Sequence, residues 1–253
     1  MDNEEMRPID HLIRDRKVNV SRNQFNEVYI WGTNANYNLG TGSQQARGVP
    51  DLLDSMKRIS IKQVCLEKFH SVFLSEDGRV WSCGHGQGGR LGLGSESSVV
   101  SPKKLMFEKD KDKLGIAMIS TSQDHSVFLM QSGSVFVCGL NCYHQLGLSP
   151  PPPYIVSPTP IRHASLRPQH SLIGVACGRF HSVVYSSREV FSWGIHAGQL
   201  GHSNITVTSA SVIEPRVVSC IYLFSRCPLS PLFLYLFFLG IKRTKLGFNS
   251  YPH

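Results

Sequence analysis

Short apolar runs, each closed by a glycine, recur along the chain. The four runs are "VYIWG", "VWSCG", "VFVCG" and "VFSWG", which begin at Val28, Val80, Val135 and Val190. Runs of this length, rich in β-branched and aromatic residues and bounded by turn-forming residues, are typical of β-strands. Spacings of 52, 55 and 55 residues separate the closing glycines, which are Gly32, Gly84, Gly139 and Gly194. The pattern therefore predicts one strand-containing unit that is used four times.

Two further landmarks stand at fixed distances from these glycines. A Leu-Gly pair follows each of them, and its leucines are Leu39, Leu91, Leu146 and Leu200. A His-Ser-Val phrase precedes the last three runs, and its histidines are His70, His125 and His181. The phrase, a turn such as "SEDG" and the glycine-closed run predict a β-hairpin. A further apolar segment before each hairpin predicts three or four strands in each unit.

The glycines and leucines have a structural interpretation. A glycine at the end of a strand is typical of a backbone that needs a positive φ or a close approach to a neighbour. The leucine that follows is expected to fold back as an apolar plug. One sheet of this kind cannot bury both faces, and repeats of about 40 to 50 residues built from short strands are typical of propeller blades. We therefore expect an all-β fold, a partial β-propeller.

The repeated phrases resemble a known family. The combination of V-Y-x-W-G, an N-x-x-x-Q-L-G-like second half and A-x-G-x-x-H-S is similar to the repeats of the regulator of chromosome condensation. The phrase "VACGRFHSVV" from Val175 matches it best. The resemblance covers about residues 28 to 203, as three full repeats and part of a fourth. It implies blades of a seven-bladed propeller, and a closed ring would need more blades than this chain carries.

The N-terminal segment narrows the resemblance. "DNEEMRPIDHLIRDR" is similar to a short ankyrin unit, although Glu5 and Arg7 replace its glycine and threonine. Together with "IKQVCLEKFHSVFLS", "CGHGQGGRLG", "LNCYHQLGLSPPP" and "LIGVACGRFH", it resembles the family of inhibitors of Bruton's tyrosine kinase. We accordingly expect an ankyrin-like helical remnant with a linker at 1–26, the repeat region at 27–216 and a non-repeat tail at 217–253.

This resemblance implies a binding protein and not an enzyme. The expected partner is the pleckstrin-homology domain of a Tec-family tyrosine kinase, which the repeats would cover and so inhibit, and no cofactor is expected. Two alternatives stay open. One is guanine nucleotide exchange or chromatin association, as in the better-known propeller family. The other is the substrate-binding part of a cullin-3 ubiquitin-ligase adaptor, although the BTB segment that would dock the cullin is absent from this sequence.

Several residues suggest catalytic or ligand-binding chemistry, but the repeats explain them more simply. Gly84, Gly86 and Gly89 spell GxGxxG, yet a phosphate cradle needs a helix to begin there, and glycines and a proline follow. The three repeated histidines could form a metal site, but they belong to successive blades. We expect instead a hydrogen bond inside each blade, between each histidine and the serine after it. Asp124, His125 and Ser126 are adjacent in sequence and do not predict a triad.

Partner contacts are expected in the loops that follow the strand-ending glycines, since loops on a rigid scaffold carry most binding residues. The candidates are Gln87, Arg90, Tyr143, His144 and Gln145. The proline-rich stretch "LSPPPPYIVSPTP" could present a polyproline II ligand to an SH3 or WW domain, but a stiff loop between strands is the simpler interpretation.

Composition limits the remaining classes. The net charge is +8, but the basic residues after position 216 have no acidic neighbours and account for half of it, so no nucleic-acid partner is expected. Seven cysteines without a C-x-x-C motif and no apolar N-terminal leader favour a reduced, cytoplasmic location. Cys83 and Cys138 take the place of Trp31 and Trp193 in other repeats and are expected to be core thiols. The apolar stretch at 217–241 leaves membrane association as a minority alternative, because its clean apolar run is shorter than a spanning helix needs.

Overall fold

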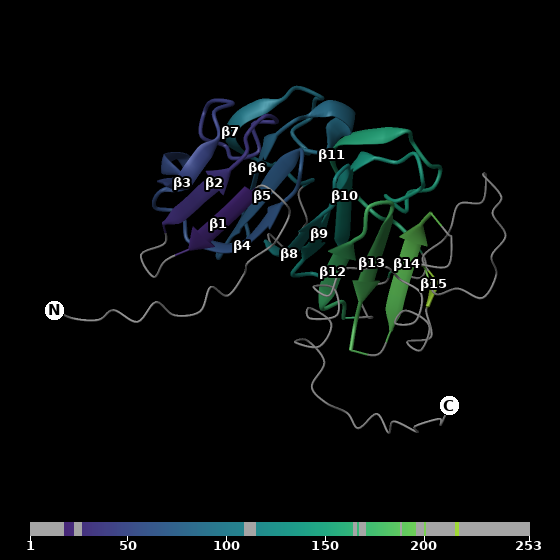
Figure 1. Cartoon of the computed structure of the whole chain (residues 1–253). Helices are drawn as coiled ribbons and strands as arrows, with labels where there is room; N and C mark the ends of the chain where they lie inside the picture. The colour runs from purple at the N-terminus through teal and green to yellow at the C-terminus, as the bar shows by residue number, and fades with distance from the viewer. Residues whose placement is uncertain are drawn as a thin grey trace, which may run out of the picture.

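The computed structural model describes residues 18–22, 27–108, 115–163, 166, 171–187, 189–195, 200 and 216–217. These residues form four antiparallel sheets that follow one another around an arc (Figure 1). The first sheet contains β1 (Val18–Arg22), β2 (Val28–Gly32) and β3 (Arg47–Leu52). The second contains β4 (Ile61–Leu66), β5 (His70–Ser75), β6 (Val80–Gly84) and β7 (Val99–Lys104). Two 3-10 turns, η1 (Asp54–Met56) and η2 (Gln87–Gly89), lie in the connections.

The third and fourth sheets repeat the second. The third contains β8 (Ile116–Thr121), β9 (His125–Met130), β10 (Val135–Leu140) and β11 (Tyr154–Pro160). The fourth contains β12 (Gly174–Cys177), β13 (His181–Tyr185), β14 (Val190–Gly194) and β15 (Arg216–Val217). In each sheet the strands pair in chain order, so every sheet is a meander. The predicted all-β fold of propeller-like blades is confirmed, and we call the four sheets the first to fourth blades.

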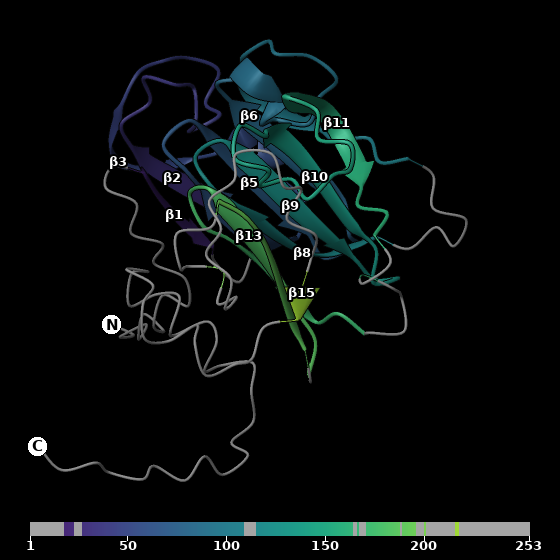
Figure 2. The ribbon, with the colours of Figure 1, turned by 90° about the vertical axis from the view of Figure 1, so that its right-hand side faces the viewer.

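The hydrophobic core lies between the blades, which are stacked one behind the other (Figure 2). Strand β9 shows why the sequence pattern is an apolar run and not an alternation, since all six of its residues are buried. Val127 packs toward the fourth blade and Phe128 toward the second, because successive residues of a strand point to opposite faces. A middle strand of a blade therefore needs apolar side chains on both faces.

The strand-ending glycines meet a close neighbour, as the sequence suggests. Gly84, Gly139 and Gly194 have φ values of 123°, 116° and 116°, which side chains rarely tolerate. A Cβ atom on any of them would lie 2.6 Å from the Cα atom of the opposite histidine, His70, His125 or His181. The space is filled by the neighbouring strand, so this position requires glycine.

Parts of the sequence-based organisation fall outside the described residues. The expected ankyrin-like remnant and most of the tail are among them, except that Val18–Arg22 forms β1 of the first blade and Arg216–Val217 forms β15. In the described part of the chain, no helix has the length and apolar character needed to cross a membrane.

Candidate functional site: the loop face and the blade joints

The antiparallel pairing brings the chain before the histidine strand and the chain after the strand-ending glycine to one end of the second, third and fourth blades. The residue after each strand-ending glycine donates its amide to the residue before each histidine: His85 N to Phe69 O at 2.7 Å, and Leu140 N to Asp124 O at 2.9 Å. The fourth blade has the same bond, from Ile195 N to the carbonyl of Phe180 at 2.9 Å. We call this end the loop face, made up of residues 33–38, 67–69, 85–90, 122–124, 140–145 and 178–180.

Directly beneath the loop face, the repeated histidines join neighbouring blades. His70 Nε2 lies 2.9 Å from Ser126 Oγ, and His125 Nε2 lies 2.8 Å from Ser182 Oγ. The sequence-based expectation of a histidine–serine bond inside each blade is therefore wrong. The physical reason is strand alternation, which turns a histidine and the serine after it to opposite faces of the sheet. His70 and His125 consequently meet the serine of the following blade.

The same serines bind the Leu-Gly loop of the preceding blade. Ser126 Oγ donates to the carbonyl of Arg90 at 3.1 Å, and Ser182 Oγ donates to the carbonyl of Gln145 at 2.7 Å. Because each hydroxyl proton is used in this way, the imidazole Nε2–H donates to the serine oxygen. Each accepting carbonyl belongs to the residue before a repeat leucine. The four repeat leucines, Leu39, Leu91, Leu146 and Leu200, are all fully buried. We call this assembly of histidine, serine and Leu-Gly loop a blade joint.

The joint histidines are neutral. Burial lowers the pKa of His70 and of His125 to about 3, with additional repulsion from Arg90 at His70 and from His181 at His125. Burial also lowers the pKa of His181 to about 4. Among the described residues, no group of three or more histidine, cysteine or acidic side chains could hold a metal ion. Hydrogen bonding within the joints accounts for His70 and His125.

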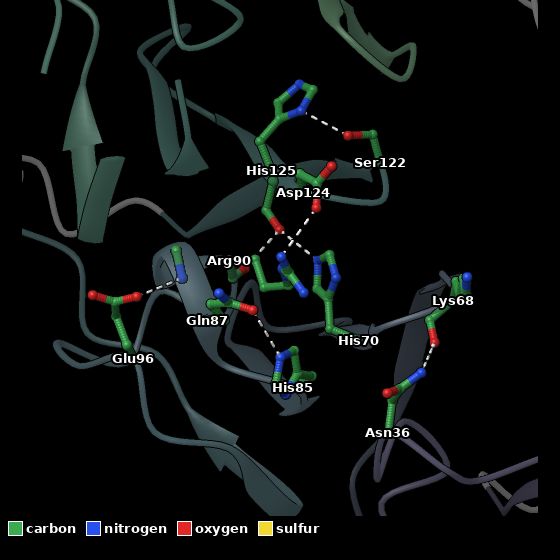
Figure 3. A network of polar contacts seen from close by, with 12 residues as sticks. Asn36, Lys68, His70, His85, Gln87, Arg90, Glu96, Ser122, Asp124 and His125 are labelled. Carbon is green, nitrogen blue, oxygen red and sulfur yellow. Dashed lines mark hydrogen bonds and ion pairs between the residues drawn. The ribbon is translucent and has the colours of Figure 1, made fainter. Parts of the chain in front are cut away.

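One ion pair connects the second joint to the loop face (Figure 3). The Arg90 guanidinium, which is 4% exposed, donates to Asp124 Oδ1 at 3.0 Å and lies 4.8 Å from the centre of the Phe69 ring. A catalytic triad would place a carboxylate at Nδ1 of the histidine, but His125 Nδ1 lies 2.6 Å from the hydroxyl of Ser122. Asp124 is therefore the ion-pair partner of Arg90, and it forms no triad with His125 and Ser126.

The GxGxxG stretch holds a carboxylate of its own chain. The amide of Gly88 donates to Glu96 Oε2 at 2.8 Å, and the amide of Gly86 donates to Ser98 Oγ at 3.3 Å. The η2 turn ends at Gly89, and no helix follows it in the described part of the chain before β7. The amides that a phosphate would need are occupied, so the loop is a structural turn.

The predicted partner-binding residues separate into two groups. Gln87 and Tyr143 are exposed on the loop face and His144 is half-buried, whereas Arg90 and Gln145 are buried in the joints. Gln145 Oε1 accepts the amide of Tyr143 at 2.8 Å and so shapes the loop that presents this ring.

Sequence reasoning missed four residues of the loop face. Lys68 Nζ lies 5.1 Å from the centre of the Phe69 ring, and the Arg179 guanidinium lies 4.9 Å from the centre of the Phe180 ring. Both cations are exposed, and Tyr143 reaches across from the third blade to within 4.6 Å of the Phe180 ring centre. A signal for them was present, because "KFH" and "RFH" place a cation and an aromatic ring before two of the histidines.

The two strand cysteines are core thiols, as predicted. Cys83 and Cys138 are fully buried, and burial raises the pKa of Cys138 to about 12. Their sulfur atoms lie 3.8 Å from the carbonyl of Asn38 and 3.7 Å from the carbonyl of Arg90. At the equivalent position of the fourth blade, Trp193 Nε1 donates to the carbonyl of Gln145 at 2.9 Å.

Comparison with known protein families identifies the repeat. The model of the regulator of chromosome condensation (RCC1) repeat matches residues 26–74, 77–129 and 132–185. The chain belongs to the RCC1 repeat family. Each matched RCC1 segment begins with the last strands of one blade and ends in the first strands of the next, so the repeat contains a joint and not a single blade.

Curated relatives also match the chain, and a solved structure shares its fold. The chain is 40% identical to "Inhibitor of Bruton tyrosine kinase" of Mus musculus over 225 residues, which are 87% of this chain and 16% of that protein. It is 33% identical to "Probable E3 ubiquitin-protein ligase HERC6" of Homo sapiens over 70% of this chain and 17% of that protein. The crystal structure of human WBSCR16 matches with a TM-score of 0.65 at 23% identity, over 80% of this chain and 50% of that chain. The chain thus spans about a sixth of the length of these curated relatives.

Proposed function

We propose that this chain is a non-enzymatic protein-interaction module that binds a non-receptor tyrosine kinase and lowers its activity by occupying it. The observation that carries the proposal is the 40% identity to an inhibitor of Bruton tyrosine kinase over 225 residues, which are 87% of this chain. The burial of His70 and His125 supports binding over catalysis, since their Nε2 atoms are used to hold neighbouring blades together.

The loop face supplies the chemistry that a protein partner needs. It presents two exposed cations, Lys68 and Arg179, each beside an aromatic ring, and the exposed ring of Tyr143. Arginine, tyrosine and other aromatic residues dominate the binding energy of protein interfaces. The nearby carboxylate of Asp124 is already paired with Arg90, so the exposed cations favour an acidic partner surface.

Within the kinase, we propose the pleckstrin-homology domain as the part that is bound. Covering a domain that recruits the kinase to membranes would inhibit it by exclusion, and a standard interface of about 800 Å² per partner fits a face built from loops of several blades. Titration calorimetry with the isolated domain and with the kinase lacking it tests this assignment. We expect the isolated domain to bind and the truncated kinase not to bind. Absence of binding to both at micromolar concentrations contradicts the proposed function.

Two variants locate the contact. Tyr143→Ala and Arg179→Ala are each expected to weaken binding about tenfold, which corresponds to about 1.4 kcal/mol and is ordinary for an interface anchor. Met106→Ala is the matched control, because Met106 is an exposed apolar residue, at 75% exposure, that follows β7 outside the loop face. Unchanged affinity in both loop-face variants would move the binding surface elsewhere on the blades.

The relative named as a probable ubiquitin ligase favours a second candidate, the substrate-binding part of a ligase. In that case the chain would slow degradation of a ligase client by competing for it, and a degradation time course with added chain would detect the effect.

A further inference from the structure

The connections from the Leu-Gly pairs to the last strands of the first three blades have equal lengths but different compositions. Six residues precede β3, β7 and β11 in these connections, at 41–46, 93–98 and 148–153. The first two read "TGSQQA" and "LGSESS", whereas the third reads "LSPPPP" and is followed by Tyr154. Because two blades make this connection with polar residues, the blade itself does not require four prolines. We call residues 150–154 the Pro-Tyr segment.

The anchor of this connection is an asparagine and not the prolines. In the first blade, Asn34 Nδ2 donates to the carbonyl of Ser43 at 2.6 Å. In the third blade, Asn141 Nδ2 donates to the carbonyl of Pro152 at 2.7 Å, and its backbone amide donates to the carbonyl of Pro153 at 2.9 Å. Both asparagines stand two residues after a strand-ending glycine. The same anchor therefore holds a polar connection in one blade and the Pro-Tyr segment in another.

The anchored segment presents most of its rings to solvent. Pro150, Pro151 and Pro153 are exposed, Pro152 is half-buried and Tyr154 is 41% exposed. A proline that precedes another proline is confined to the extended region of polyproline II. That helix has three residues in each turn, so Pro151 and Tyr154 fall on the same side of the segment. The segment is thus a short, rigid ridge of prolines that ends in an exposed aromatic ring.

A contact with the second blade restrains the tyrosine at the end of the ridge. The Tyr154 side chain hydrogen-bonds to Glu96, and this bond raises the pKa of Tyr154 above its usual value. Glu96 is itself held, because its Oε2 atom accepts the amide of Gly88 at 2.8 Å. A ring that is already restrained loses less side-chain entropy when a partner covers it.

The charges around the segment indicate which kind of groove it fits. Proline-rich ridges dock on the aromatic-lined grooves of WW and SH3 domains. SH3 ligands also carry a basic residue beside their prolines, but the sequence has no charged residue between Asp124 and Arg162. WW domains instead bind a pair of prolines together with a tyrosine two residues later, which is the order of Pro151, Pro152 and Tyr154. The absence of charge and the exposed tyrosine both favour the WW type of groove.

We propose that the Pro-Tyr segment is a docking site for a WW domain, with Pro151 and Pro152 on the aromatic rings of its groove and Tyr154 in a neighbouring pocket. The segment lies outside the loop face. The site therefore does not depend on the proposed kinase partner, and either proposal can fail without the other.

Titration calorimetry of the full chain tests the proposal with two isolated probes, a WW domain that binds Pro-Pro-x-Tyr peptides and an SH3 domain. We expect one WW domain to bind each chain with a dissociation constant of about 10–100 μM, and the SH3 domain not to bind. Tyr154→Ala should weaken WW binding at least about tenfold, as expected for an aromatic anchor.

A second variant exchanges the prolines for a sequence that the fold already accepts. Pro150→Ser, Pro151→Glu, Pro152→Ser and Pro153→Ser together copy residues 95–98 of the second blade, so the connection keeps its length. This variant should keep the circular dichroism and the urea midpoint of the parent chain and lose WW binding at least about tenfold. Pro50→Ala is the matched control, because Pro50 is an exposed proline on β3 without a tyrosine near it, and it should bind as the parent does.

Four results would overturn the proposal. The first is no binding of the WW domain to the chain, and the second is binding of the SH3 domain alone. The third is unchanged WW affinity in Tyr154→Ala or in the four-residue exchange, because the groove would then contact another surface. The fourth is binding of the WW domain to a free peptide of residues 148–156 but not to the chain, because the fold would then hold the segment out of reach.

Discussion

The blade joints and the loop face lie within a few residues of each other and follow opposite rules. In the joints the same atoms recur: His70 and His125 donate to the serine of the next blade at nearly the same distance. On the loop face the residue just before each repeated histidine changes, from Phe69 to Asp124 to Phe180. The comparison separates the residues that close the fold from those free to specify a partner.

Burial explains this division. A joint residue is enclosed by two blades, so its shape and its hydrogen bonds are both constrained. The same histidine and serine therefore recur in successive joints. An exposed loop-face residue such as Lys68 or Tyr143 has water on one side, and the backbone of the face is held by bonds such as the one from His85 N to Phe69 O. The side chain can then vary without cost to the sheet. Variants that break a joint should therefore lower stability more than variants of the exposed face residues.

The largest loss is expected from Gly139→Val. The new Cβ atom would lie 2.6 Å from His125 Cα, and the residue would have to adopt a φ of 116°, which a β-branched side chain disfavours. Backbone strain and overpacking together should lower the free energy of unfolding by about 3–5 kcal/mol. Urea denaturation followed by circular dichroism measures it.

Gly48→Ala is the control for that change. Gly48 lies on β3, a Cβ atom there would meet nothing within 4 Å, and its φ is outside the left-handed region. The free energy of unfolding should change by less than about 0.5 kcal/mol. Equal losses in Gly139→Val and Gly48→Ala would mean that the strand-ending glycines are not special, and the account of the joints would be wrong.

Acid should weaken the joints next most strongly. The pKa of His70 and of His125 is about 3 in the folded chain, against about 6.5 in an unfolded one. At pH values between these two pKa values, the histidines are protonated in the unfolded chain and neutral in the folded chain. The free energy of unfolding therefore falls as the pH falls below about 6.5. From pH 7 to pH 5 the expected loss is about 2 kcal/mol for each of the two histidines.

Denaturation curves at several pH values test this loss, and His125→Gln supplies the comparison. Glutamine keeps an amide donor but does not titrate, so the variant should start less stable at pH 7 and lose about 2 kcal/mol less on acidification. A parallel pH dependence of the variant and the parent chain would assign the acid sensitivity to other groups.

Much of the fold could be predicted from the sequence because its requirements are local and repeated. The glycine-closed runs, the hairpins and the core position of Cys83 and Cys138 follow from residue type and spacing, and the structure confirms them. The direction of the histidine–serine bond could not be predicted from adjacency. It depends on which face of the strand each side chain occupies, and on how close the next blade stands.

The binding site was harder to predict for a similar reason. Position after a strand-ending glycine indicates a loop, but it does not separate Tyr143, which is 42% exposed, from Gln145, which is 1% exposed two residues later. That difference arises because the Gln145 carbonyl receives both Ser182 and Trp193 from the next blade. The sequence of one repeat does not reveal such a contact, because the contact depends on how the next blade is placed against it.

The smallest expected loss gives the sharpest test of the comparison, because Tyr143 lies on the loop whose Gln145 carbonyl accepts from Ser182. Ser182→Ala leaves the buried Nε2–H of His125 without an acceptor and removes one of two donors from the Gln145 carbonyl, so it should cost about 1–3 kcal/mol. Tyr143→Ala removes an exposed ring whose main contact is Phe180, and should cost less than about 1 kcal/mol. Chemical denaturation of both variants gives the two values directly. Loss of the small serine hydroxyl should lower the free energy of unfolding more than loss of the large ring. Removing the hydroxyl leaves a buried polar group unpaired, whereas the space left by the ring is open to water. The reverse order would mean that the loop face, and not the joints, holds the blades together.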